Sequence, residues 1–160
     1  MSKIFLRYAR EDDIPRLITG GVVPTGGEST AWQRRLTLSL AEQRSGRRLV
    51  LVAEDRAGLV AMVQLVFKFP PGYHDPEAAN GHDIAMIETL RTARRAPAAV
   101  STELLQQAQL LARKKAVTTL TFCLSLDDAK GITMAKQWGF KEFRIMPEAD
   151  RMLAFFRKDV

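Results

Sequence analysis

The stretch from Leu49 to Phe67 constrains the fold more than any other part of the sequence. It contains two apolar runs rich in β-forming residues, separated by the short segment Asp55-Arg56-Ala57-Gly58. Two such runs around a short Gly-containing turn predict a β-hairpin. We expect this hairpin to form the centre of a sheet.

The remaining segments predict four helices and five further strands. Apolar residues at helical spacing from Val100 to Ala112, followed by Arg113-Lys114-Lys115, predict the best-defined helix, because cations favour the C-terminal end of a helix. Acidic residues at 11–13, Ser29-Thr30 and Asp127-Asp128 are positioned to cap the other three helices. Strands are expected at residues 3–8, 84–90, 118–124, 141–145 and 152–157.

The predicted order of elements is β-α-α-β-β-β-α-β-α-β-β. A hairpin combined with crossover helices predicts a mixed sheet rather than a wholly parallel one. We therefore expect an α/β (α+β-like) fold with a mostly antiparallel sheet of about seven strands and about four flanking helices. The length of 160 residues and the apolar content of 46% fit a single domain spanning residues 1–160.

Composition argues against several classes of protein. The net charge is +6, but the basic residues are mostly scattered, and basic runs at helix ends are usually solvated or interact with the helix dipole, so a nucleic-acid-binding role ranks third. The single cysteine and two histidines give neither a disulfide nor zinc spacing, and no segment reaches the length of a membrane span. We expect a soluble, cytoplasmic protein with no metal, nucleic acid or membrane partner.

Three segments resemble motifs of the Gcn5-related N-acetyltransferase (GNAT) family. Ile87-Glu88-Thr89-Leu90 resembles the fourth strand of that family. The segment from Arg94 to Ser101 stands where the family has its Arg/Gln-x-x-Gly-x-Gly/Ala loop, directly before the long helix. Asp127-Asp128-Ala129 to Gly139-Phe140 is similar to the family's Asn-led helix that ends in Gly-Phe. The resemblance covers nearly the whole chain and implies a divergent GNAT member.

This resemblance implies acetyl-CoA as cosubstrate. Main-chain groups of the fourth strand would pair with the pantetheine arm, and the loop would hold the pyrophosphate. The physics of the loop supports this role independently, because a helix N-terminus presents unpaired N–H groups that bind phosphate. The residues expected to contact the cofactor are Leu90, Thr92, Arg94, Arg95, Ala98, Ala99, Ser101 and Asp128.

Two departures from the family pattern bear on activity. Ala98, Ala99 and Ser101 replace the glycines of the loop, and Pro97 removes one N–H donor, so an ordinary helix that begins with proline is the alternative interpretation. The family's tyrosine acid is replaced by Ala135. A positioned acid contributes about 10²–10⁴-fold in rate, but a thiol of pKa about 8.5 also leaves as the anion. The loss therefore slows the reaction without excluding it.

Glu88 is the candidate general base, because a carboxylate within an apolar strand is costly unless it is paired or functional. The alternative is an inward acid that pairs with an arginine. Cys123 fits a small core residue better than a thioester contact, and Trp32 fits either the core or an acceptor pocket. Loop residues that would face an acceptor, or simply be solvated, are Tyr73, His74, Asp75, His82 and Asp83.

The function that these features favour is N-acetyl transfer from acetyl-CoA to a small-molecule or peptide amine by direct attack. Backbone N–H groups near Leu90 would stabilise the oxyanion. The alternative is a catalytically weakened GNAT-fold module that binds acyl-CoA or a protein partner in a regulatory role. The resemblance also allows a homodimer.

Overall fold

The computed structural model describes residues 3–68 and 83–160. Within these residues the chain forms seven strands and four α-helices, in the order that the sequence predicts, with one added turn of 3₁₀ helix. The strands are β1 (Phe5–Tyr8), β2 (Arg48–Asp55), β3 (Gly58–Val66), β4 (Ile84–Thr92), β5 (Thr119–Ser125), β6 (Lys141–Glu148) and β7 (Arg151–Asp159). The helices are α1 (Asp13–Thr19), the 3₁₀ turn η1 (Gly26–Glu28), α2 (Ser29–Arg44), α4 (Val100–Lys114) and α5 (Ala129–Gln137).

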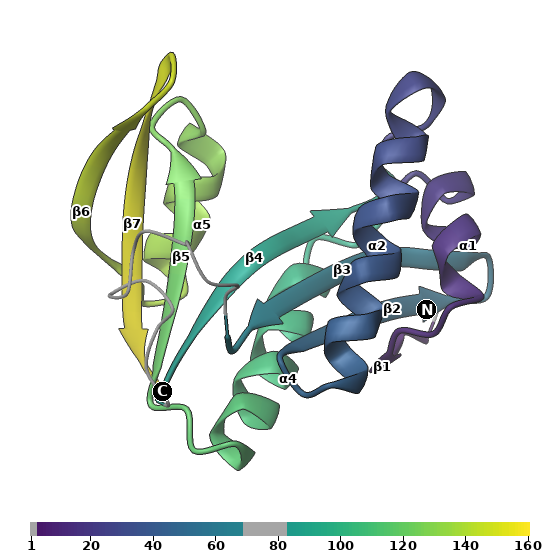
Figure 1. The fold of residues 1–160 in the computed structure, drawn as a ribbon, viewed down its shortest axis with the longest axis horizontal. Helices are drawn as coiled ribbons and strands as arrows, with labels where there is room; N and C mark the ends of the chain where they lie inside the picture. Colours follow the sequence, from purple (N-terminus) through teal and green to yellow (C-terminus); the bar gives the residue numbers. More distant parts are fainter. Residues whose placement is uncertain (1–2, 69–82) are drawn as a thin grey trace. The chain divides into compact units, whose positions relative to one another are not determined.

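The strands form one mixed sheet in the order β1-β2-β3-β4-β5-β7-β6 (Figure 1). β4 pairs with β5 in parallel, whereas β1 pairs with β2, and β7 with both β5 and β6, in antiparallel fashion. This confirms the predicted fold class. The expectation that the β2–β3 hairpin forms the centre is wrong in detail, because β4 is the middle strand of the order.

Residue contacts divide the chain into two compact units. Unit 1 comprises Met1–Leu65 and Thr89–Ala108, and unit 2 comprises Val66–Glu88 and Gln109–Val160. β4 and α4 therefore each contribute residues to both units. No helix within the described part of the chain is long and apolar enough to span a membrane.

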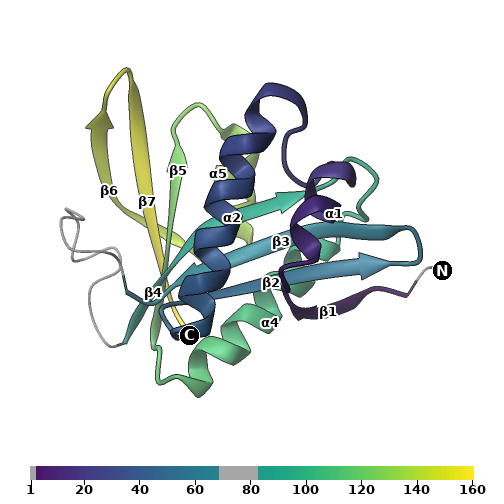
Figure 2. The ribbon, with the colours of Figure 1, turned by 45° about the vertical axis from the view of Figure 1, so that its right-hand side comes forward.

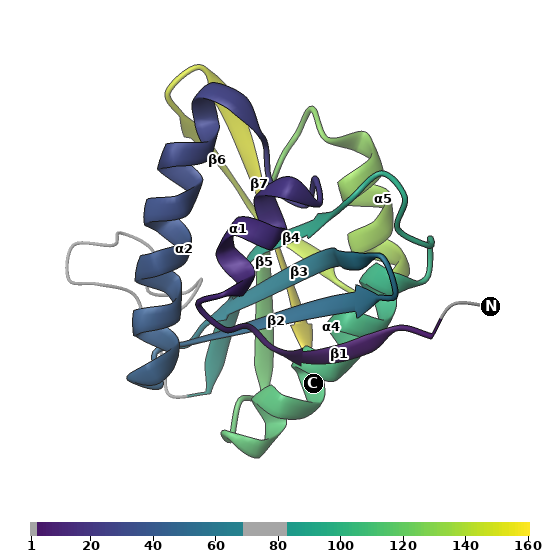
Figure 3. The ribbon, with the colours of Figure 1, turned by 90° about the vertical axis from the view of Figure 1, so that its right-hand side faces the viewer.

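In unit 1, the β2–β3 hairpin is buried on both faces. α1 and α2 cover one face, and the first part of α4 lies against the other (Figure 3). Val50 and Val52 of β2 share a core cluster with Leu17 of α1 and Leu40 of α2. Since side chains alternate along a strand, the buried Leu51 between these valines points to the opposite face. The hairpin is apolar at nearly every position because both of its faces are covered.

In unit 2, β5, β7 and β6 run side by side, with α5 beside β5 (Figure 2). Phe122 of β5 meets Phe140, just beyond α5, in an edge-to-face contact with ring centroids 6.1 Å apart. Met86, Leu153 and Phe155 form a separate buried cluster, against which Cys123 packs. Cys123 therefore lies where the core interpretation places it.

β6 and β7 are longer than the sequence predicts, and a two-residue turn joins them. Ala149, in this turn, adopts a positive φ of 52°. Positive φ in a hairpin turn normally appears in sequence as Asn-Gly or Asp-Gly, and Ala149-Asp150 carries no such signal. The turn was therefore not visible in the sequence, and the predicted strands end too early.

The predicted caps of α1 and α2 are also corrected by the structure. Ser29 does not cap α2 with its side chain; its hydroxyl instead donates to the Gly26 carbonyl oxygen at 2.8 Å. The backbone N–H of Ser29 also bonds to Gly26, because η1 continues directly into α2 and supplies the acceptor. Asp12 occupies the N-cap position of α1 but makes no side-chain cap bond.

Arg7 joins β1, α1 and β2 through two carboxylates. Its Nη1 and Nη2 donate to both oxygens of Asp13 at 2.7 and 2.8 Å, and its Nε donates to Glu54 at 3.0 Å. Asp13 is fully buried and also accepts the Arg10 N–H at 2.7 Å. Burial alone would raise the pKa of Asp13, but the hydrogen bonds from Arg7 and Arg10 outweigh it and hold that pKa below its ordinary value.

We expect Asp13→Asn to lower the free energy of unfolding by about 2 kcal/mol, because the buried charge-assisted hydrogen bonds to Arg7 are weakened. At this chain length the melting temperature should fall by about 4–8 °C. Asp12→Asn is the matched control, since Asp12 pairs with Arg10 at a site where both side chains are 59% exposed. Its effect should stay within about 0.5 kcal/mol.

Urea denaturation at several pH values tests whether the ionised carboxylate of Asp13 is the source of this stability. A carboxyl whose pKa is lowered on folding stabilises the protein above its unfolded pKa of about 3.9, and this stabilisation is lost as the pH falls through the lower folded pKa. The stability difference between the wild type and Asp13→Asn should therefore shrink as the pH falls below about 4. A constant difference, or equal effects of the two substitutions at pH 7, would contradict the assignment.

Candidate functional site

The segment after β4 forms a tight turn that carries Arg94 and Arg95. The Ala93 N–H bonds to the Val60 carbonyl oxygen at 2.7 Å, which attaches the start of the turn to β3. The Ala96 N–H bonds back to Ala93 at 3.0 Å and closes the turn, with the two arginines at its middle positions. Both arginines are exposed.

A second turn leads directly into α4. The Val100 N–H bonds to the Pro97 carbonyl oxygen at 3.1 Å, which places the exposed Ala98 and Ala99 at the middle positions. Val100 and Ser101 are buried and anchor the first turn of the helix in unit 1. The predicted phosphate loop is thus a pair of turns that ends at a helix N-terminus, the local geometry that binds phosphate in other proteins.

This loop does not need glycine for its backbone conformation. Among the described residues, the only ones besides glycine with positive φ are Ala116 and Ala149, and both lie outside the loop. Ala98 and Ala99 therefore adopt φ values that any residue tolerates. What the missing glycines change is the space above the backbone, which two methyl groups now occupy.

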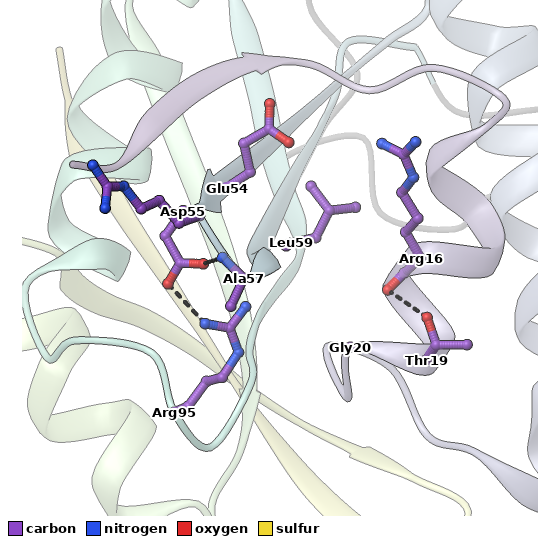
Figure 4. A pocket seen from close by; sticks show the side chains of 10 residues that line it. Arg16, Thr19, Gly20, Glu54, Asp55, Ala57, Leu59 and Arg95 are labelled. Atoms are coloured by element: carbon purple, nitrogen blue, oxygen red, sulfur yellow. Dashed lines mark hydrogen bonds and ion pairs between the residues drawn. The ribbon is translucent and has the colours of Figure 1, made fainter. Parts of the chain in front are cut away.

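Arg94 and Arg95 have different surroundings. The Arg95 Nη1 donates to Asp55 Oδ2 at 2.7 Å, and the other Asp55 oxygen accepts the Ala57 N–H at 2.8 Å (Figure 4). The hydrogen bond from Arg95 lowers the pKa of Asp55 below its ordinary value. Within residues 3–68 and 83–160, Arg94 takes part in no ion pair. Arg95 is thus held against the β2–β3 turn, whereas Arg94 is available to a ligand.

A pocket of about 640 Å³ adjoins this ion pair (Figure 4). The β2–β3 turn, the C-terminal end of α1 and Arg95 line it, and Arg16 and Arg56 contribute two further guanidiniums. All of its lining residues belong to unit 1. The sequence did not reveal this pocket, because it joins segments that are far apart along the chain.

Leu90 and Thr92 occupy the last part of β4, in unit 1 with the loop. Leu90 is half-buried and Thr92 is exposed. The structure therefore brings these two residues and the five predicted loop residues, Arg94, Arg95, Ala98, Ala99 and Ser101, together in one unit. Glu88 and Asp128, the other two predicted site residues, belong to unit 2.

Glu88 is exposed, contrary to the reasoning that selected it. The buried part of β4 covers Ala85, Met86 and Ile87 and ends one residue before it. The sequence argument assumed that the apolar run continued around the carboxylate, and this premise is wrong. Its role as general base stays a prediction, which now depends on the position of Glu88 in the strand rather than on desolvation.

Asp128 is the N-cap of α5. Its Oδ1 accepts the Gly131 N–H at 2.9 Å. A side chain at position 131 would collide with this carboxylate, so the glycine makes room for the cap. This confirms the predicted cap, while contact between Asp128 and a cofactor stays a prediction.

Ala135 is completely buried in α5. A tyrosine at this position would have no space without rearrangement of its neighbours. The helix therefore offers no acid where the family commonly carries one.

The remaining candidates contribute less to a site. Asp83 joins the sheet, since its carbonyl oxygen accepts the N–H groups of Thr118 and Thr119 at 2.8 and 3.1 Å. Tyr73, His74, Asp75 and His82 lie outside the described residues. In the ranges that the structure describes, no three His, Cys, Asp or Glu side chains gather as a metal site requires.

Asp55 is the residue that sequence reasoning missed. Its place before Ala57-Gly58 predicts a turn, but nothing local indicates a partner 40 residues away. Only the three-dimensional structure connects this turn with the predicted phosphate loop.

Comparisons with known proteins identify solved structures that share this fold. A scan against models of protein families finds no match, and no curated protein matches the sequence. Solved structures do match over nearly the whole chain. The ribosomal-protein-alanine N-acetyltransferase from Brucella melitensis has a TM-score of 0.73 at 19% identity, with coverage of 98% of this chain and 99% of that one.

Two further structures agree with this result. An N-acetyltransferase from Staphylococcus aureus Mu50 has a TM-score of 0.75 at 16% identity, with 99% of each chain covered. The PaiA N-acetyltransferase from Thermoplasma acidophilum, solved in complex with coenzyme A, has a TM-score of 0.73 at 15% identity, again with 99% of each chain covered. The chain therefore has the fold of the GNAT N-acetyltransferases, and the predicted resemblance is confirmed at the level of the fold.

We expect Asp128→Ala to lower the free energy of unfolding by about 1 kcal/mol, because the Gly131 N–H loses its acceptor. Thermal unfolding should shift down by about 2–4 °C. Asp127→Ala is the control at the neighbouring position, and Asp128→Asn should retain most of the stability, since asparagine caps helices equally well. Equal losses for Asp127→Ala and Asp128→Ala would contradict the cap assignment.

Proposed function

We propose that this chain is an N-acetyltransferase that moves the acetyl group of acetyl-CoA to an amine. The observation that carries this proposal is the loop between β4 and α4, where the exposed Arg94 stands before a helix N-terminus and forms no ion pair with the residues that the structure describes. A coenzyme A complex of the same fold supports the choice of cosubstrate.

The loop suits a pyrophosphate for two reasons. The first turn of a helix offers N–H groups without intrahelical acceptors, and the aligned peptide dipoles add partial positive charge there. Arg94 adds a full charge and a planar set of donors that matches phosphate oxygens. The methyl groups of Ala98 and Ala99 restrict the approach, but they leave the N–H groups in place.

The reaction follows from general chemistry and the residues at hand. The acceptor nitrogen attacks the thioester carbon, a C–N bond forms, and the C–S bond breaks as the thiolate leaves. Glu88 takes the proton of the attacking amine, directly or through water, and the thiolate takes a proton from solvent. The N–H near Leu90 donates to the carbonyl oxygen while it carries negative charge. The buried Ala135 supplies no acid, which predicts slower turnover than a positioned acid allows.

A second candidate is a catalytically weakened module of the same fold. Two observations favour it, namely the small side chains that replace the loop glycines and the alanine at position 135. Such a protein would bind acyl-CoA or a protein partner in a regulatory role. A homodimer is compatible with both candidates.

Acetyl-CoA should raise the melting temperature of the wild type. At about 100 times its dissociation constant a ligand adds about 2.7 kcal/mol, which corresponds to about 5–11 °C at this size. Arg94→Ala should weaken binding about 10-fold or more, because a charge-assisted hydrogen bond to phosphate is lost. Arg47→Ala, an exposed arginine between α2 and β2, is the control and should leave the acetyl-CoA shift unchanged.

No shift for the wild type would refute cofactor binding and with it the enzyme proposal. A shift that survives in Arg94→Ala would show that the loop does not hold the phosphates. Binding of acetyl-CoA without release of coenzyme A in the presence of any amine would favour the regulatory module.

Arg95 should act through Asp55 rather than on the phosphates. We therefore expect Arg95→Ala and Asp55→Ala to weaken acetyl-CoA binding to a similar degree, since each releases the loop from the β2–β3 turn. The double variant should bind no more weakly than either single variant, because two residues of one ion pair are not additive. Calorimetric titration gives the dissociation constant of acetyl-CoA for the wild type, the two single variants and the double variant. If Arg95→Ala weakens binding and Asp55→Ala does not, Arg95 contacts the phosphates itself.

A further inference from the structure

Trp32 of α2 has two arginine side chains over its ring. The Arg35 Cζ lies 5.0 Å and the Arg91 Cζ 5.1 Å from the ring centroid, both within the range of cation–π attraction. Trp32 packs against the core of unit 1 and is only partly buried, whereas both arginines are exposed. The indole is therefore a fixed surface on which two cations are held.

Arg91 is positioned more firmly than a typical surface arginine. It extends from β4, and its Nε donates to the Val22 carbonyl oxygen at 3.1 Å. This hydrogen bond uses one donor group and leaves the two terminal amino groups of the guanidinium for another partner. The side chain is thus oriented in advance, which reduces the entropy lost when a ligand binds.

The two positive charges are close and are not neutralised by an ion pair within the described residues. Since both guanidiniums lie about 5 Å from one centroid, they are at most about 10 Å apart. This separation is comparable to the screening length of about 8–10 Å in physiological salt, so the charges repel each other. An anion bound between or beside them would relieve the repulsion.

The chemistry of the cluster favours a carboxylate or a phosphate. A guanidinium binds either group through two parallel N–H···O bonds, which gives direction as well as energy. The indole would pack against the carbon atoms that carry the anionic group. An amine without such a group would gain none of the guanidinium hydrogen bonds, and its ammonium charge would be repelled by the two arginines.

We propose that Trp32, Arg35 and Arg91 bind the anionic group of the acceptor, and that the acceptor is a small amine carrying a carboxylate or a phosphate. This proposal rests on the acetyltransferase function proposed above. Arg91 directly follows Leu90 in β4, so their Cα atoms are less than about 4 Å apart. The anion would therefore be held beside the backbone segment proposed to stabilise the oxyanion.

Fluorescence of Trp32 provides a test that does not depend on catalysis. Trp138→Phe leaves Trp32 as the only tryptophan, since the chain contains two. The probes are free amino acids against their amides, and O-phosphoethanolamine against ethanolamine. We expect at least one probe that carries the carboxylate or the phosphate to change the emission with saturation, while its counterpart without that group does not. The two pairs of probes distinguish carboxylate from phosphate.

Arginine variants in the same background identify the cations involved. Arg35→Gln and Arg91→Gln should each weaken binding of the anionic probe about 10-fold or more. Arg34→Gln is the matched control, because Arg34 is the exposed neighbour of Arg35 on α2, whereas the cations over the ring are Arg35 and Arg91. The anionic probe that binds should also be the amine that the wild type acetylates.

Several outcomes would overturn the inference: no probe with an anionic group changes the emission, the counterparts without that group bind equally well, or Arg34→Gln weakens binding as much as Arg91→Gln. Preferential acetylation of the neutral amines would overturn it as well. The shift in melting temperature with acetyl-CoA distinguishes failure of this inference from failure of the proposed function. If acetyl-CoA stabilises the protein but no amine with an anionic group binds, the protein remains a candidate acetyltransferase with a different acceptor.

Discussion

Burial of β2 and β3 on both faces is the constraint from which the rest of unit 1 follows. A strand covered on both sides carries few polar side chains, and the buried Arg48 and Gln64 of this hairpin are hydrogen-bonded to each other at 2.8 Å. The turn and the edges of the hairpin therefore carry most of the groups that can form polar contacts with other segments. Asp55 lies at the end of β2 and binds Arg95, and the carbonyl oxygen of Val60 in β3 binds the N–H of Ala93. The predicted phosphate loop is therefore attached to the hairpin at two points, one in the backbone and one through an ion pair.

The elements could be predicted because each has a local cause. The spacing of apolar residues in α4, the apolar runs of β2 and β3, and the Asp128 cap all act over a few residues. The order of these elements and the three segments that resemble GNAT motifs together predicted the fold, which the solved structures confirm although the three compared are at most 19% identical in sequence. Sequence identity this low leaves the pattern of burial and capping as the main signal that survives.

The polar contacts that shape the site could not be predicted, because they join residues that are distant in sequence. Arg7 lies 47 residues from Glu54, Asp55 lies 40 from Arg95, and Val22 lies 69 from Arg91. Each of these contacts depends on which strands become neighbours. The premise that Glu88 is buried was wrong for a related reason, since the sequence does not show where along β4 the covering side chains stop. The burial of a charged residue is a property of its neighbours, and these come from other parts of the chain.

The arginines of unit 1 show how one residue type takes several roles. Arg7 is enclosed with two carboxylates and stabilises the fold, whereas Arg95 holds a loop against a turn through one. Arg94 and Arg91 have no carboxylate partner within the described residues, and they lie at the two ends of a four-residue stretch that includes the end of β4. In a transferase, Arg94 would bind the negative charge of the cofactor and Arg91 that of the acceptor. On these proposals two small anionic ligands would use Arg94 and Arg91, through the same attraction of positive charge for anions that nucleic-acid binding would use.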